Sequence, residues 1–226
     1  MKIINLPVVN STNDWCKHND NGEDLIVIAR TQTTGRGTKG RNFISDEGGI
    51  YLSTLKRYKN FLAKNAFKIL INSCVAVCKT LQSLDITPVI RWSNDVLVNG
   101  KKICGTLIEN TFQGDKITRS IVGIGLNVNN KIPPSLKDIA VSIESILGKS
   151  VSLDKILQTL ISNLQNEYTV QEYKSYMPWL GGNVILKTEK SEITATALDI
   201  NESGRLICNI NGEVKDISSA EVSIRF

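Results

Sequence analysis

The sequence predicts an α+β fold in which helices pack on a mixed or antiparallel sheet, with a small SH3-like β-barrel at the C-terminus. Three observations predict it. Two segments repeat apolar residues at helical spacing, the segment between them is rich in strands and tight turns, and the last ~45 residues hold five short alternating strands. We place the domain boundary near Leu180, which separates residues 1–180 from residues 181–226.

The first part of the chain predicts one short helix and two strands. Ser11 and Thr12 carry small oxygen-bearing side chains ahead of NDWCKH, which is typical of a helix start. After the turn at Asn21-Gly22, LIVIAR is a β-rich run, and IYLSTL is a second run with alternation. The glycine-rich residues 35–41 lie between these two strands.

Two segments show the spacing of amphipathic helices. From Phe61 to Leu84, apolar residues recur at intervals of three, four and seven, which predicts one helix packed on the core. Ser152 is a suitable N-cap for a second helix that runs to about Tyr173. The apolar face of this second helix consists of Leu153, Ile156, Leu157, Leu160, Ile161 and Leu164.

The segment from Pro88 to Val128 predicts strands joined by tight turns. Asn99-Gly100 is a two-residue hairpin turn, and Gln113-Gly114-Asp115 makes a second turn, so that three strands form a meander. Beyond MPWLGG the strands are shorter and closely spaced, as expected for a small barrel. They read NVILKT, ITATALDI, RLICNI, EVKDI and VSIRF.

Composition limits the classes of function. No run approaches the ~18 apolar residues of a membrane span, and the N-terminus lacks the features of a signal peptide, so we expect a cytoplasmic protein with no membrane partner. Five scattered cysteines and one histidine, His18, make a poor zinc site and argue against a Ser-His-Asp hydrolase. The net charge of +5 suits an anionic substrate or an acidic protein as well as nucleic acid.

The glycine-rich segment Gly35-Arg-Gly-Thr-Lys-Gly40 fits the pattern G-x-G-x-x-G. A dinucleotide fingerprint requires a helix directly after its last glycine, but a Gly-Gly pair and a strand follow here. The segment instead carries Arg36, Lys39 and Arg41, which is typical of a flexible loop that closes over an anionic ligand. Taken alone, it could equally be a hairpin with solvated charges.

Three further signals follow the glycine loop. Arg91-Trp-Ser-Asn-Asp95 lies between two strands, Lys102 and Gly105 follow the hairpin turn, and Gly123-Ile-Gly-Leu-Asn127 ends the meander. Each has a structural explanation of its own, because Asn-Asp pairs cap turns and glycines in strands mark bulges. Together with the glycine loop they make four signals, and four such signals in this order are much less expected by chance.

The set resembles the biotin–protein ligases. Their G-R-G-R-x-G-R is matched by Gly35–Arg41, their K-W-P-N-D by Arg91–Asp95, their K-x-x-G-x-L-x-E by Lys102–Glu109 and their G-x-G-x-N by Gly123–Asn127. The family's S-T-N is present at Ser11–Asn13. The resemblance extends from about residue 8 to the C-terminus. It implies a class II synthetase-like catalytic domain followed by an SH3-like barrel.

The sequence departs from the family pattern at a few positions. Thr38 stands where an arginine is usual and Phe43 where a tryptophan is common, while Arg91 and Ser93 replace Lys and Pro. The last two keep the charge and the turn-forming character. Thr38 removes a cation with several donors from the glycine loop.

The resemblance implies a reaction in two steps, with biotin as substrate and ATP and Mg²⁺ as cofactors. The carboxylate of biotin attacks the α-phosphate of ATP to give biotinyl-5′-AMP, and a lysine of a biotin carboxyl carrier protein then takes the biotinyl group. The resemblance suggests the carrier of acetyl-CoA carboxylase. Because the chain begins almost at the catalytic motif, we expect no winged helix and no DNA partner. Exposed strand edges could support a homodimer.

The resemblance also implies the site residues. The catalytic candidates supply charge or handle the incoming lysine, and are Arg36, Arg41, Asp95 and Lys102. The candidates for binding biotin are Ser11, Thr12, Gln32, Gly35, Arg36, Lys102, Gly105 and Gly123. The candidates for binding ATP are Arg36, Thr38, Lys39, Arg41, Trp92, Asn94 and Asn127. The pattern names no metal ligands.

Two alternatives remain beside this interpretation. Lipoate–protein ligases share the fold and the adenylation chemistry, but their R-R-x-S-G-G-G stretch is missing here. A non-catalytic module that binds biotin or nucleic acid belongs to another class. It would show no biotin-dependent exchange between ATP and pyrophosphate, and a nucleic-acid binder would show an affinity that falls steeply with salt.

Overall fold

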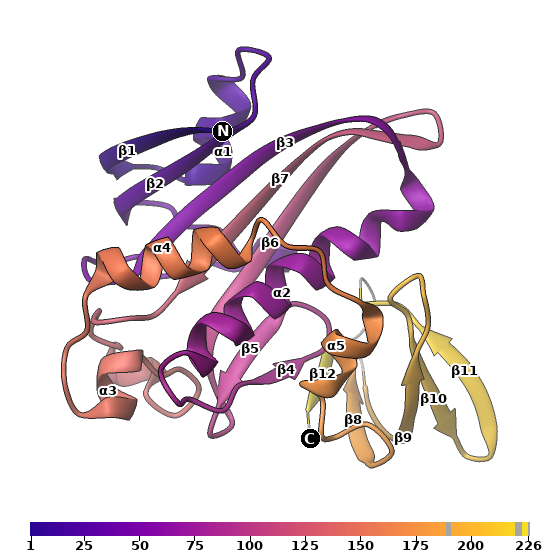
Figure 1. Ribbon diagram of the computed structural model, residues 1–226. Coiled ribbons are helices and arrows are strands. Elements are labelled where there is room, and N and C mark those ends of the chain that lie inside the picture. The colour runs from indigo at the N-terminus through magenta and orange to yellow at the C-terminus, as the bar shows by residue number, and fades with distance from the viewer. Residues whose placement is uncertain (189–190, 220–222, 226) are drawn as a thin grey trace.

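The chain folds around two sheets, a seven-stranded one and a five-stranded one (Figure 1). The computed structural model describes residues 1–188, 191–219 and 223–225. The strands of the first sheet are β1 (Lys2–Val9), β2 (Leu25–Gln32), β3 (Ile50–Leu62), β4 (Val89–Arg91), β5 (Asp95–Val98), β6 (Lys101–Gln113) and β7 (Lys116–Leu126). The helices are α1 (Thr12–His18), α2 (Ala66–Gln82), α3 (Ile143–Leu147), α4 (Leu153–Asn163) and α5 (Val170–Ser175).

The seven-stranded sheet has the order β1-β2-β3-β7-β6-β5-β4. Its first two strands are parallel and every other neighbouring pair is antiparallel. The hairpin at Asn99-Gly100 joins β5 to β6, with both residues at positive φ as such a turn requires. The mixed sheet and its meander confirm the predicted fold class.

The edge strand β1 was not predicted from the sequence. It runs parallel to β2, and its ladder omits Pro7, whose lack of an N–H an edge strand tolerates. Ile3 and Val8 are about half exposed. An edge strand with exposed apolar residues and a proline lacks the alternation that would have identified it.

The two predicted helices differ in length from the expectation. α2 begins at Ala66, because Phe61 and Leu62 still pair with β7 as the end of β3. The segment 152–173 holds two helices. Ser152 caps α4 as predicted, accepting a hydrogen bond from Lys155 N, but Thr169 and Glu172 form a capping box that starts α5 anew.

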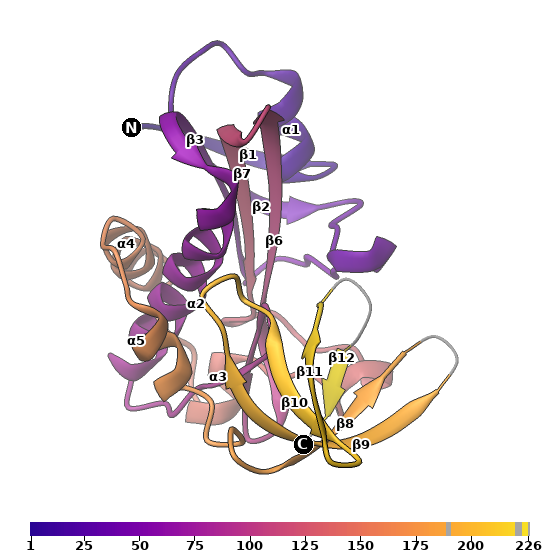
Figure 2. The ribbon, with the colours of Figure 1, turned by 90° about the vertical axis from the view of Figure 1, so that its right-hand side faces the viewer.

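Helices cover both faces of the large sheet. α2, α4 and α5 lie on one side of it, and α1 lies on the other with the glycine loop (Figure 2). The core is continuous from the sheet into α2, where Cys74 and Cys78 are fully buried. All five cysteines are free and buried. No helix of the described residues is long and apolar enough to cross a membrane.

The C-terminal sheet has the order β11-β10-β9-β8-β12, and its neighbouring strands are antiparallel. It follows α5 directly and lies beside it in both views (Figures 1 and 2). Its strands correspond to the five short runs expected from the sequence: β8 (Asn183–Lys187), β9 (Glu192–Ile200), β10 (Leu206–Ile210), β11 (Glu213–Ile217) and β12 (Ser223–Arg225).

Candidate active site

A pocket with about 450 Å³ of empty space, part of it open to solvent, lies between α1, the glycine loop, β6 and β7. The structure brings most of the predicted site residues to this one place. Its lining includes Ser11, Thr12, Gln32, Arg36, Thr38, Asn94, Lys102, Gly105 and Gly123.

One end of the pocket is neutral and rich in hydrogen-bonding groups. Gln32 Oε1 accepts hydrogen bonds from Thr12 N at 2.8 Å and from Thr12 Oγ1 at 3.1 Å. Ser53 is buried, and its Oγ lies 2.7 Å from Thr12 Oγ1 and 2.6 Å from Asn13 Oδ1, so that its single hydroxyl hydrogen serves one of these acceptors at a time. Ser11 caps α1 and accepts from Asp14 N. These contacts fix the first turn of α1 against the sheet.

The floor of the pocket is made of backbone, because strand glycines leave room where side chains would stand. A Cβ at Gly123 would lie 2.2 Å from Asn13 Oδ1, and one at Gly125 would lie 2.5 Å from the ring of Phe43. A Cβ at Gly105 would lie 2.8 Å from Lys102 Nζ. Any larger residue would therefore displace a wall of the pocket. Gly35 lies behind the wall, packed on the backbone of Phe43.

Lys102 lies in a cluster of charges at the opposite end. Its Nζ is 2.6 Å from Asp95 Oδ1, and Arg91 holds the other carboxylate oxygen, Oδ2, at 2.7 Å. Burial alone would raise the pKa of Asp95, but the Lys102 and Arg91 cations outweigh it and hold the pKa below its usual value. The Nζ also lies 5.7 Å from the centre of the Phe43 ring. Asp95 therefore fixes the lysine and stays ionised.

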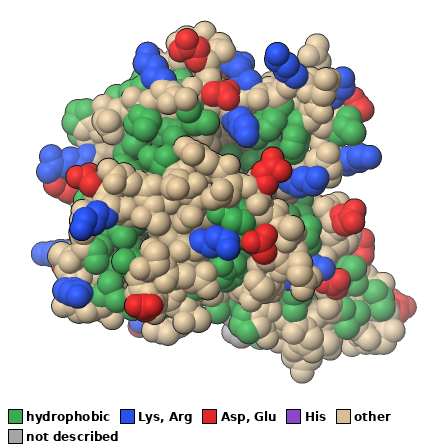
Figure 3. All heavy atoms as spheres, in the orientation of Figure 1, with side chains coloured by type: hydrophobic (Ala, Val, Ile, Leu, Met, Phe, Trp, Pro, Cys, Tyr) green, Lys and Arg blue, Asp and Glu red, His purple; other side chains and the backbone are tan. Residues whose placement is uncertain are grey.

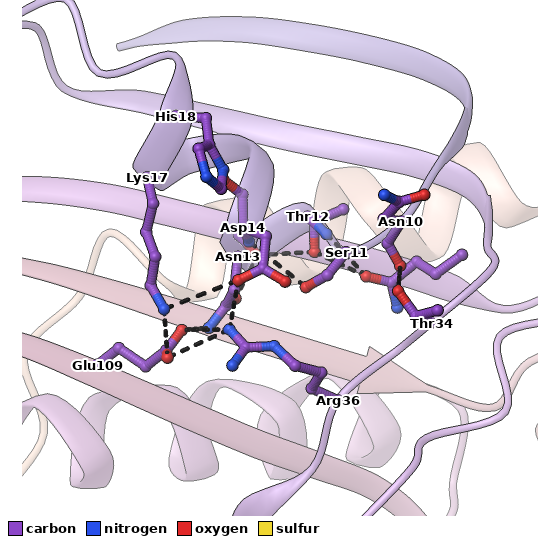
Figure 4. A network of polar contacts seen from close by, with 12 residues as sticks. Asn10, Ser11, Thr12, Asn13, Asp14, Lys17, His18, Thr34, Arg36 and Glu109 are labelled. Carbon is purple, nitrogen blue, oxygen red and sulfur yellow. Dashed lines mark hydrogen bonds and ion pairs between the residues drawn. The ribbon is translucent and has the colours of Figure 1, made fainter. Parts of the chain in front are cut away.

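Arg36 of the glycine loop is held by two carboxylates (Figure 4). Its Nη2 lies 2.6 Å from Asp14 Oδ1 and 3.1 Å from Glu109 Oε2. Glu109 also accepts from Lys17 Nζ at 2.6 Å and from Asn13 Nδ2 at 2.8 Å. Burial would raise the pKa of Glu109, but these donors and the nearby Arg36 lower it. The loop is thus tethered to both α1 and β6.

Other predicted residues lie away from the pocket lining. Lys39 and Arg41 are exposed, and Lys39 has a positive φ of 57° in the short 3₁₀ turn Thr38–Gly40. Trp92 and Asn127 are buried. The Trp92 indole donates to a backbone carbonyl, and Asn127 Nδ2 donates to Val141 O at 3.2 Å. Their contact with ATP stays a prediction.

Sequence reasoning did not select some residues that shape the site. Asn13, Phe43 and Gly125 line the pocket, and Glu109 anchors the glycine loop. Asn13, Gly125 and Glu109 stand inside the S-T-N, G-x-G-x-N and K-x-x-G-x-L-x-E motifs, so the signal that could have found them was present. Phe43 was noted only as a departure from a common tryptophan.

Taken together, the geometry suits a ligand with a neutral polar head and an anionic end. The head would meet Thr12 and Gln32, and the anionic end would meet Lys102. Among residues 1–188, 191–219 and 223–225, no group of three or more His, Cys, Asp or Glu could hold a metal ion. Asp95 and Glu109 lie just outside the pocket lining, and both are already paired with protein cations.

Comparisons with known proteins agree with this geometry. The family model of the biotin/lipoate A/B protein ligase family matches residues 6–127, and that of the biotin protein ligase C-terminal domain matches residues 180–225. The bifunctional ligase/repressor BirA of Bacillus subtilis is 30% identical over 92% of this chain and 68% of its own length.

Two further relatives are similar over most of their length. A biotin–[acetyl-CoA-carboxylase] ligase of Paracoccus denitrificans is 27% identical, over 87% of this chain and 88% of its own. The structure of biotin protein ligase from Aquifex aeolicus in complex with biotin and ATP is 29% identical. It superposes with a TM-score of 0.81, covering 99% of this chain and 98% of that one. This chain belongs to the biotin/lipoate A/B protein ligase family and carries a biotin protein ligase C-terminal domain.

Proposed function

We propose that this protein is a biotin–protein ligase, which activates biotin with ATP to biotinyl-5′-AMP and transfers biotin to a lysine of a carrier protein. The observation that carries the proposal is the pocket itself. Its lining combines the neutral hydrogen-bonding groups of Thr12 and Gln32 with the cation Lys102, which Asp95 fixes, over a glycine floor. Arg36 lines the same pocket beside α1, where it is paired with Asp14 and Glu109. The family, its C-terminal domain and a similar structure that binds biotin and ATP support it.

In the first step, an oxygen of the biotin carboxylate attacks the α-phosphorus of ATP and pyrophosphate leaves. Two anions must approach each other, so the step depends on cations fixed in advance where charge develops. We propose that Lys102 bridges the carboxylate and the phosphate and that Arg36 and Arg41 neutralise the phosphate oxygens. Asp95 keeps Lys102 in place through the contact at 2.6 Å.

In the second step, the amine of the carrier lysine attacks the carbonyl carbon of the mixed anhydride and AMP leaves. The amine must arrive neutral or lose a proton. Because the pKa of Asp95 is held low by its cations, this carboxylate is a weak base. We therefore propose that Asp95 orients the reacting groups, and that the proton leaves to solvent or to the departing phosphate.

The neutral end of the pocket would select the substrate. The ureido ring of biotin has two N–H donors and one carbonyl acceptor, and the hydroxyl and amide groups of Ser11, Thr12 and Gln32 can satisfy both kinds. Gly105 and Gly123 would allow the bicyclic ring to lie close to the backbone. Gly35, which has no side chain, would allow the backbone of Phe43 to pack closely against it and so complete the wall of the pocket.

The remaining proposed roles concern ATP, the metal and the carrier. We propose that Thr38, Lys39, Asn94 and Asn127 contribute to the ATP site, and that Trp92, which lies outside the pocket lining, supports this site through the turn on which it stands. We propose that Mg²⁺ enters mainly on the phosphates of ATP, which together with water are its usual ligands. We propose the biotin carboxyl carrier of acetyl-CoA carboxylase as partner and the cytoplasm as the compartment, where five free cysteines stay reduced.

The face drawn in Figure 3 gives no support to the nucleic-acid alternative. On the face drawn in Figure 3, Lys and Arg side chains are interspersed with Asp and Glu side chains, and they form no basic stripe. Binding to a nucleic-acid backbone would favour such a stripe.

One experiment tests the proposed function. The protein is incubated with biotin, ATP, Mg²⁺ and a carrier domain, and the mass of the carrier is measured. We expect a gain of one biotinyl group that requires ATP, and an exchange between ATP and pyrophosphate that requires biotin. Lipoate in place of biotin serves as the control. Labelling by lipoate instead of biotin, or no exchange with either, would overturn the proposal.

A further inference from the structure

We propose that the loop between β9 and β10 of the C-terminal domain positions the adenylation site, through the hydrogen bond from Trp92 Nε1 to Gly204 O at 3.0 Å. The inference rests on the proposed function and assigns Gly204 as a positioning residue. The pocket lining comes entirely from residues between 11 and 125. Among the described residues, the C-terminal domain therefore acts on the pocket through a neighbouring element.

That element is the turn Trp92–Asn94, which joins β4 to β5. Each of its three residues is fixed by a different part of the protein. Trp92 donates to the C-terminal domain, and Ser93 O accepts from the Tyr173 hydroxyl of α5 at 2.5 Å. Asn94 Nδ2 donates to Thr106 O of β6 at 2.7 Å. The turn is therefore anchored by three hydrogen bonds, one at each of its residues.

The turn Trp92–Asn94 also determines the position of the charged residues around Lys102. Asn94 lines the pocket, and the next residue, Asp95, holds Lys102 Nζ at 2.6 Å. Arg91, directly before the turn, binds the same carboxylate. A movement of Trp92 would therefore change the position of Asn94 and the Asp95–Lys102 pair, and leave α1 and Gln32 in place.

The β9–β10 loop is built rigidly enough to act as an anchor. Asn201 Oδ1 accepts hydrogen bonds from Ser203 N and Arg205 N, both at 3.0 Å, and Asn201 O accepts from Gly204 N at 2.9 Å. Gly204 has a φ of +82°, and a Cβ there would lie 2.4 Å from the Phe67 ring. Only glycine satisfies both conditions.

A second contact leads from the same glycine to the same turn. Phe67, on which Gly204 packs, lies edge-to-face against Tyr173, with ring centroids 5.3 Å apart. Tyr173 is the residue whose hydroxyl binds Ser93 O. An ion pair between Lys174 Nζ of α5 and Asp199 Oδ1 of β9, at 2.6 Å, holds the same interface. Gly204 thus supports Trp92 directly and Ser93 through two packed rings.

The indole itself is poorly placed for contact with a substrate. Trp92 is only 4% exposed and lies outside the pocket lining. Its side chain is buried in the interface, so its influence on the reaction passes through the turn.

The test compares Gly204→Ala, Trp92→Phe, their double variant and a matched control in the full-length enzyme. The control is Gly212→Ala, because Gly212 has a similar φ of +90° but open space around its Cβ. Formation of biotinyl-5′-AMP is followed in single turnovers, with saturating enzyme in excess over biotin. At saturation the rate constant is independent of the folded fraction, and the half-saturating enzyme concentration reports biotin binding.

We expect Gly204→Ala and Trp92→Phe each to lower the rate constant about tenfold or more, since a displacement of ~1 Å can cost on the order of 100-fold. The half-saturating concentration should change by a smaller factor than the rate constant does. Gly212→Ala should keep the wild-type rate constant. If both substitutions break one contact, the double variant should be no slower than the slower single variant.

A structural readout accompanies the kinetics. Hydrogen exchange of the Trp92 indole N–H, followed by NMR, should accelerate in Gly204→Ala and not in Gly212→Ala. The inference would be overturned if the two alanine variants had equal rate constants. It would also be overturned if the fold-losses of the single variants multiplied in the double variant, or if only biotin binding were weakened. If Gly204→Ala does not fold, the Trp92→Phe variant is sufficient for the test: an unchanged rate constant in that variant would overturn the inference. Failure of the wild type to form the adenylate would overturn the proposed function, while the indole exchange would still report the contact.

Discussion

Lys102 and Asp95 form an ion pair across the β5–β6 hairpin, with Nζ 2.6 Å from Oδ1. The side chains of both are largely shielded, at 29% and 14% exposure. A flexible lysine is thereby held at one end of the pocket before any substrate arrives, so no ordering of this side chain is needed during the reaction. The same pair favours the ionised form of Asp95 and so lowers its pKa.

Lys102→Ala should impair adenylate formation strongly, raising the barrier by a few kcal/mol, on the order expected when a fixed charge is lost from a transition state. The measurement is biotin-dependent exchange between ATP and pyrophosphate. Lys101→Ala is the matched control, because Lys101 Nζ binds the backbone carbonyl of Lys137 and does not line the pocket. Exchange near the wild-type rate in Lys102→Ala would contradict the assignment.

The lowered pKa of Asp95 predicts how stability depends on pH. Its usual value is 3.8, and the folded value lies below this. The stabilisation is therefore complete above about pH 4 and is lost as the pH falls through the folded pKa. Asp95→Asn should lower the free energy of unfolding by about 1–3 kcal/mol at pH 7, as expected for a lost charged hydrogen bond.

Urea unfolding of wild type and Asp95→Asn at several pH values checks this prediction. The difference in unfolding free energy should stay constant from pH 7 to about 5 and shrink below about 4. Asp138→Asn, at an exposed carboxylate, should show a small difference throughout. A difference that grows on acidification would have the wrong sign for a depressed pKa.

The tether of the glycine loop predicts a change in loop mobility. Glu109→Gln removes one of the two carboxylates that hold Arg36. Because Arg36 is 39% exposed, the pair should contribute only about 0.2–1 kcal/mol, which corresponds to up to about fivefold more opening. Limited trypsin digestion, with cleavage followed at Arg36, Lys39 and Arg41, measures it.

The control for this digestion is Glu213→Gln, which removes an exposed carboxylate 2.8 Å from Lys215 Nζ in the C-terminal sheet. Cleavage in the glycine loop should be unchanged in this variant. High salt should bring wild type and Glu109→Gln closer together, because it screens the ion pair. Equal cleavage at low salt would show that the Asp14 contact alone holds the loop.

Local sequence patterns predicted much of the fold. Apolar spacing identified α2, the hydroxyl of Ser152 identified the start of α4, and Asn99-Gly100 identified the hairpin, because each depends on neighbours in the chain. β1 was not predicted, because its pairing with β2 is a long-range contact and Ile3 and Val8 are exposed.

The site followed the same rule. Motif glycines mark the floor of the pocket, where a Cβ at Gly123 or Gly125 would clash with Asn13 or Phe43. The glycines can be found from their motifs even though these partners are remote in sequence. The partners of Arg36 and Trp92 could not be predicted in the same way. Glu109 and Gly204 are remote in sequence from the residues that they hold, and no spacing in the chain relates them.

Thr38 provides the last prediction, because it stands where the family usually has an arginine. It lines the pocket at the start of the 3₁₀ turn Thr38–Gly40, but it brings no charge. The next cation, Lys39, is exposed and lies outside the lining. An arginine at position 38 would add a cation beside the adenylate, and a charged hydrogen bond is worth roughly 1–3 kcal/mol. We therefore expect Thr38→Arg to release preformed biotinyl-5′-AMP about tenfold or more slowly than the natural protein, measured by trapping the free adenylate. Thr38→Gln, with a long neutral side chain, separates the effect of charge from that of size. Equal release from natural protein and Thr38→Arg would mean that backbone amides or Lys39 already retain the adenylate, and that the glycines of the loop matter more than its second cation.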